Sequence, residues 1–75
     1  MNRPELIKNL KPYWKEARDI YEQMFSSINE LEERMQKETG IEDLMIFCVD
    51  GSLAGIGNYS RTMKLINDME LENEW

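Results

Sequence analysis

Apolar side chains recur with helical spacing through the first half of the chain. From Tyr13 onward they are separated by three or four positions, which is the period of an amphipathic helix. Neither glycine nor proline occurs between Tyr13 and Thr39, and Gly40 then suits the left-handed end of a helix. The pattern predicts one long helix over residues 12–39.

A shorter helix is expected before it, over residues 4–10. Leu6, Ile7 and Leu10 give this segment one apolar side, and a proline in its first turn is tolerated. Pro12 lacks a backbone N–H, and its ring clashes with the carbonyl group four residues earlier. We therefore expect the chain to break between the two helices just before Pro12.

Residues 44–57 predict a β-hairpin. Leu44 to Val49 is an unbroken apolar run, which is typical of a strand buried on both faces. Asp50-Gly51 follows it and is a strong signal for a two-residue type I′ turn. The remaining residues to Gly57 form the returning strand.

A last helix is expected over residues 60–72. Asn58 or Ser60 can cap its first turn, and Ile66 with its neighbours gives it an apolar side. The predicted order is short helix, long helix, hairpin and helix. This α-α-β-β-α order defines a single α+β domain that spans residues 1–75.

Length and charge add an expectation about association. A 75-residue chain buries only about 60% of its unfolded surface, so its core needs support. Cys48 is the single cysteine and histidine is absent, which excludes an internal disulfide and the usual zinc site. The net charge is −6, with +3 on residues 1–18 and −6 on residues 19–43. Association with another chain is the remaining means of support.

The long helix suggests how such a dimer is built. A helix over residues 12–39 is roughly 40 Å long, whereas a compact domain of this size is about 30 Å across. Its second half carries the narrow apolar stripe of a coiled coil. Antiparallel packing of two such helices places basic ends beside acidic ends. We therefore predict a homodimer through Met24, Ile28, Leu31 and Met35.

Catalysis is not expected from this composition. General acid–base chemistry needs paired groups with shifted pKa values in a cleft, and the carboxylates fall on predicted solvent faces and turns. Cys48 lies between Phe47 and Val49, which indicates a buried structural thiol. We expect no enzymatic activity, no cofactor and no metal.

One stretch has an alternative interpretation as an anion site. Gly55-Ile-Gly57-Asn-Tyr-Ser60 is close to the G-x-G-x-x-G pattern of dinucleotide-binding loops, but Ser60 replaces the third glycine. The bare glycines also indicate close approach by a helix or a bulge. If residues 51–61 hold a phosphate or another anion, Ser60 and Arg61 are the expected contacts.

These features favour a small acidic protein-interaction module. The acidic charge argues against direct binding of nucleic acid and fits a partner with a basic surface. The absence of a signal peptide or an apolar run of bilayer length predicts a cytoplasmic protein without membrane contact. An alternative is an inhibitor that masks the nucleic-acid-binding surface of its target. The carboxylates available for that role are Glu30, Glu33, Glu42, Asp43, Glu70, Glu72 and Glu74.

Overall fold

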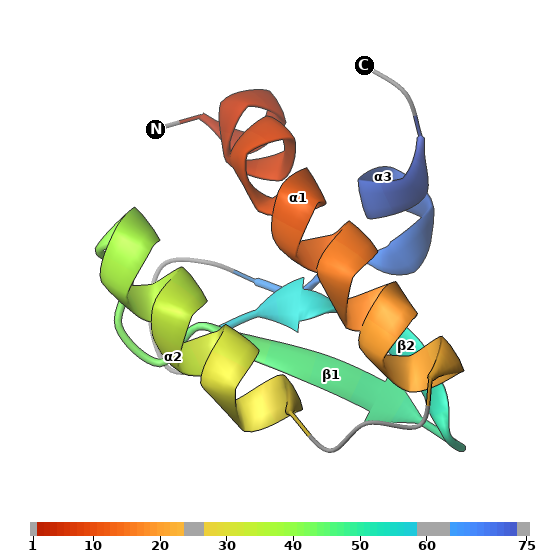
Figure 1. Ribbon diagram of the computed structural model, residues 1–75. Helices are drawn as coiled ribbons and strands as arrows, with labels where there is room; N and C mark the ends of the chain where they lie inside the picture. The colour runs from red at the N-terminus through yellow and green to blue at the C-terminus, as the bar shows by residue number, and fades with distance from the viewer. Residues whose placement is uncertain (1, 24–26, 59–63, 74–75) are drawn as a thin grey trace.

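The computed structural model describes residues 2–23, 27–58 and 64–73. It is an α+β fold, as the sequence predicts, with a three-stranded antiparallel sheet in the order β1-β2-β3. The elements in chain order are α1 (Arg3–Glu22), α2 (Ile28–Thr39), β1 (Met45–Val49), β2 (Ser52–Gly57), β3 (Ile66–Asn67) and α3 (Asp68–Glu72). Figure 1 shows α1 and α3 above the sheet and α2 in front of it.

The predicted break before Pro12 is wrong, because α1 runs through this proline without interruption. The helix begins at Asn2, whose side chain accepts a hydrogen bond from the Glu5 backbone N–H at 2.9 Å. Pro12 and Lys8, four residues earlier, are both exposed, so water can reach the Lys8 carbonyl group that the proline leaves without its helical partner. The apolar face of α1 is therefore continuous from Ile7 to Ala17.

The predicted long helix is also wrong, because residues 12–39 belong to two helices. α1 ends at Glu22, and α2 begins at Ile28 with Ser27 at its N-terminal cap position. A helix of roughly 40 Å would exceed the longest dimension of this compact chain, which is 33 Å. Folding α2 back buries its apolar stripe within one molecule. The predicted end at Gly40 is confirmed, with φ of 72° and its N–H bonded to the Gln36 carbonyl.

The predicted hairpin is confirmed. β1 and β2 pair antiparallel, and Asp50 and Gly51 between them have φ values of 53° and 79°, as a type I′ turn requires. The register shifts after Phe47, so that Ala54 is an extra residue on β2. This bulge keeps Leu53 on the side of the sheet that packs against the core.

The predicted C-terminal helix over residues 60–72 is too long. Residues 60–63 lie outside the described residues; from residue 64 onward the helical part is α3, and Ile66 and Asn67 instead pair with β2 as a third strand. The cap of α3 is Asn67, which accepts from the Glu70 N–H at 3.0 Å. Asn58 has another role, because its buried side chain donates to the Glu42 carbonyl group at 2.5 Å and ties the end of β2 to the chain before β1.

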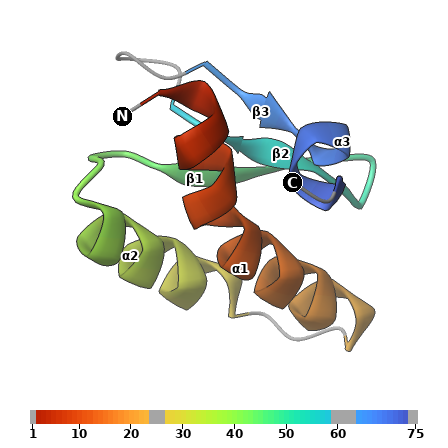
Figure 2. The same ribbon diagram turned by 90° about the horizontal axis from the view of Figure 1, so that it is seen from above.

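The core lies between the helices and one face of the sheet. Trp14 of α1 and Met35 of α2 are among its largest fully buried side chains. Figure 2 shows α1 crossing over the strands and α2 beside the edge of β1. The buried apolar residues are Ile7, Leu10, Trp14, Ala17, Leu31, Met35, Leu44, Ile46, Ile56, Ile66 and Leu71.

Candidate functional site

The predicted dimer seam does not lie on the surface. Leu31 is 2% exposed and Met35 is fully buried within a single chain, and Ile28 packs partly buried against the same core. Met24 lies outside the described residues. The side chains expected to meet a second copy therefore stabilise the fold of the chain itself. A dimer through them would require opening the core.

The glycine pair of the predicted anion loop lies inside β2. A Cβ atom on Gly55 would come within 2.2 Å of the Ile66 carbonyl oxygen, and one on Gly57 within 2.7 Å of the Leu65 Cα. The close approach that the sequence indicated is therefore confirmed, but the backbone of residues 65 and 66 makes it. No space is left at these glycines for a phosphate. Ser60 and Arg61 lie outside the described residues.

Cys48 is exposed, and the prediction that it is buried is wrong. Its thiol lies on the α1 side of the sheet near the rim, where it shares a hydrogen bond with the Tyr21 hydroxyl group. This bond, together with partial burial, raises the pKa of the Tyr21 hydroxyl above its ordinary value. The apolar neighbours in the sequence were misleading because they point to the opposite face.

The outward face of β1 carries two of the three large apolar side chains that are exposed among the described residues. Side chains alternate along a strand, so Met45, Phe47 and Val49 point away from the buried Ile46. Met45 is 47% exposed and Val49 is 61% exposed, with Phe47 half-buried between them. We call these three residues the outer stripe. Among the described residues no helix covers it, because α1 and α3 lie on the other side of the sheet (Figure 1).

The exposure of the outer stripe shows that the prediction of a strand buried on both faces is wrong. The apolar run from Leu44 to Val49 predicted a strand buried on both faces, but only the face of Ile46 is covered. On β2 the outward positions opposite Met45 and Phe47 are the two glycines, and the Leu65 side chain and backbone pack against them. On this face of the sheet the apolar side chains that are most exposed, Met45 and Val49, therefore come from β1, and Leu65 lies beside them over β2.

The free edge of β1 is blocked by α2. The Ile46 N–H donates to the Glu32 carboxylate at 2.8 Å, and the Gln36 side-chain amide donates to the Leu44 carbonyl group at 2.9 Å. Glu32 and Gln36 are one helical turn apart, so together they occupy backbone groups that another strand would otherwise pair with. The backbone groups of the edge at these positions are therefore not free to pair with another strand, whereas Met45 and Val49 of the outer stripe are exposed.

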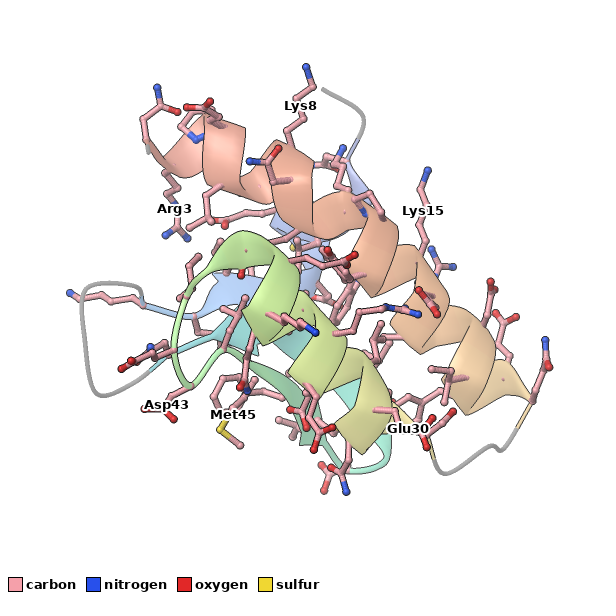
Figure 3. The ribbon with its side chains drawn as sticks, turned by 60° about the vertical axis from the view of Figure 1, so that its left-hand side comes forward. Arg3, Lys8, Lys15, Glu30, Asp43 and Met45 are labelled. Carbon is pink, nitrogen blue, oxygen red and sulfur yellow. The ribbon has the colours of Figure 1, made fainter. Side chains whose placement is uncertain are left out.

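Two aspartates stand at the ends of β1. Asp43 precedes the strand and Asp50 follows it, both exposed and both with positive φ, at 57° and 53°. Asp and Asn tolerate this left-handed conformation better than most residues. Figure 3 shows Asp43 and Met45 projecting outward from neighbouring positions at one end of the strand.

The basic charge of α1 is matched partly within the chain. Arg3 bonds Glu70 of α3 at 2.8 Å, and Arg18 lies 3.6 Å from Glu72. Arg34 of α2 pairs with Glu16 of α1. Lys8 and Lys15 point outward on the far side of α1 (Figure 3). Two basic residues of segment 1–18 therefore pair with α3 of the same chain, whereas the predicted dimer set this segment beside the acidic residues 19–43 of a second copy.

The surface has shallow depressions rather than an enclosed cleft in its described part. The one between α1, the hairpin turn and α3 has a volume of 300 Å³ and is lined by Tyr21, Leu53 and charged residues.

Within the described ranges, no three thiol or carboxylate groups gather as a metal site would require. No helix among the described elements combines the length and the apolar content needed to cross a bilayer.

The chain matches no known protein-family model, and comparisons with curated protein sequences and with solved structures gave no match. A function for this chain is therefore inferred from its own geometry. The outer stripe is the candidate site. The sequence held a signal for it, since Met45, Phe47 and Val49 alternate with the core residues Leu44 and Ile46.

Proposed function

We propose that this protein is a small, non-catalytic protein-interaction module that binds its partner through the outer stripe. The observation that carries the proposal is the exposure of Met45 and Val49 on a sheet face that no described helix covers. Exposed apolar side chains gathered on one face, with polar residues around them, mark interaction surfaces in soluble proteins. Their hydration is lost on contact, which favours binding.

The hydrogen bonds along the edge of β1 support the same proposal. Glu32 and Gln36 satisfy backbone groups along its edge, which is how proteins prevent unwanted strand pairing. A strand whose edge is closed but whose face keeps Met45 and Val49 in solvent is protected against strand addition while remaining open to side-chain contacts. The apolar face is then best explained by a partner that packs onto it.

Polar isosteres of the outer stripe test the proposal. We expect the double variant Met45→Gln, Val49→Thr to fold as the parent does, because both positions are exposed. Immobilised parent protein and the variant are each exposed to a lysate of the native source, and bound proteins are compared by mass spectrometry. The variant should lose at least one protein that the parent retains at about tenfold enrichment.

Lys8→Gln, Lys15→Gln is the matched control, since it changes two exposed side chains on the opposite side of the molecule. This control should retain the same protein. Equal capture by the parent and the outer-stripe variant would contradict the proposal. If only the lysine variant loses the captured protein, the partner binds at α1 and not at the outer stripe.

A further inference from the structure

We infer that the partner of the outer stripe is a protein segment that presents apolar side chains flanked by lysine or arginine. This inference rests on the proposed function and adds the chemistry of the partner. The apolar contacts alone do not make a specific interface, because a typical one involves about 20–30 residues on each side. The partner must therefore also contact what surrounds the outer stripe, and both ends of the stripe carry an exposed aspartate.

The segment that contains β1 is acidic. Residues 38–58 contain four acidic residues, Glu38, Glu42, Asp43 and Asp50, and no lysine or arginine. Glu38 is bonded to the Tyr13 hydroxyl at 2.5 Å, on the side of α1. Asp43 and Asp50 remain at the two ends of the outer stripe, with exposed Glu42 beside the first. Two exposed lysines are also nearby: Lys37 borders the same depression as Glu42, and Lys64 precedes Leu65, which packs against the outward side of Gly57.

The two aspartates are held at a fixed separation. β1 is an extended strand between them, which places their backbones on the order of 20 Å apart. A fixed pair of negative charges with apolar side chains between them is complementary to basic residues on both sides of an apolar centre. Such charges steer the approach of the partner and set its orientation, while the apolar contact keeps it bound.

A second copy of the chain does not present apolar side chains with basic residues on both sides. Two outer stripes face to face would bring two sets of Asp43 and Asp50 together, and each molecule already carries a net charge of −6. The outward lysines of α1, Lys8 and Lys15, share their helix face with Arg18 and with exposed Pro12 rather than with large apolar side chains. A different protein is therefore the occupant that the charges favour.

Three short synthetic peptides serve as probes. The first alternates lysine with leucine, the second alternates glutamate with leucine, and the third alternates lysine with serine. Each is titrated into isotope-labelled protein while the backbone amide resonances are followed. The lysine–leucine peptide should shift the amides of residues 43–50, and the other two should bind about tenfold more weakly.

The charge is tested by Asp43→Asn, Asp50→Asn, which keeps residues that tolerate positive φ at both positions. We expect this variant to bind the lysine–leucine peptide about three- to tenfold more weakly at low salt and with less dependence on salt. Lys8→Gln, Lys15→Gln should leave the affinity unchanged or increase it slightly.

Four results would overturn the inference. The first is that the glutamate–leucine peptide binds as tightly as the lysine–leucine peptide, and the second is that the double variant Asp43→Asn, Asp50→Asn keeps the affinity of the parent. The third is that the peptide shifts only amides of α1 or α2. The fourth is that the amides of residues 43–50 shift with protein concentration in the absence of any peptide. The last result would make a second copy the occupant. If the double aspartate variant binds normally while Met45→Gln, Val49→Thr loses the native partner, only the charge inference fails and the proposed function stands.

Discussion

Glycines at two positions of β2 decide how the C-terminal part of the chain folds. Without side chains at Gly55 and Gly57, the backbone of residues 65 and 66 lies directly against β2, and Ile66 reaches the core. The sequence indicated a close approach here but could not name the approaching segment, because the bare face is equally suited to a helix or a strand. The turn at Asp50-Gly51 was predictable because its φ requirement is local.

Gly55→Ala should destabilise the protein by about 1–3 kcal/mol, because the new methyl group meets the Ile66 carbonyl oxygen, a backbone atom that cannot rotate away. Denaturant unfolding measures the change. Gly51→Ala is a useful comparison, since its Cβ has open space and only its φ of 79° is unfavourable, for about 1–2 kcal/mol. Parent-like stability of Gly55→Ala would mean that β3 does not lie against β2 as described.

At the scale of elements, the division of the N-terminal region into helices could be predicted only in part. Apolar periodicity located the helical residues, but the sequence interpretation placed the break at Pro12 instead of between Glu22 and Ile28. The proline is tolerated because it faces water. Sequence spacing offered one local signal for the start of α2, since Ser27 and Glu30 have the spacing of a capping box.

Pro12→Ala should stabilise the protein by about 1–3 kcal/mol. Alanine restores a backbone N–H in the middle of α1 and removes the clash of the ring with the preceding turn, while the exposed position adds no packing strain. The gain is reduced by the greater freedom of the unfolded chain. Thermal unfolding should show a higher Tm, and an unchanged or lower Tm would indicate that Pro12 lies at a required kink.

Glu32→Ala should open the edge of β1. The Ile46 N–H loses the carboxylate that it donates to, so its hydrogen exchange should become faster and stability should fall by about 1–2 kcal/mol. Glu33→Ala removes a neighbouring exposed carboxylate from the same helix and serves as the control. Equal exchange of the Ile46 amide in both variants would show that Glu32 does not cover the edge.

For the whole molecule, the sequence predicted the α+β class and the hairpin but misjudged which surfaces are buried. The apolar stripe of α2 was assigned to a second chain, yet a single chain buries Leu31 and Met35. The run from Leu44 to Val49 was assigned to the interior, yet Met45 and Val49 face solvent. Both errors have the same origin, because apolar content along a sequence does not indicate which of two faces the rest of the chain covers.

The proposed function requires that the partner bind at the outer stripe. To locate the contact, a photo-cross-linking amino acid is placed at Val49 in one variant and at Lys15 in another, and each variant is irradiated in a lysate of the native source. Val49 is exposed on the outer stripe, and Lys15 is exposed on α1. We predict one dominant cross-linked protein from position 49 and none of that protein from position 15. If that protein is cross-linked from position 15 but not from position 49, the partner binds on the α1 side and not at the outer stripe.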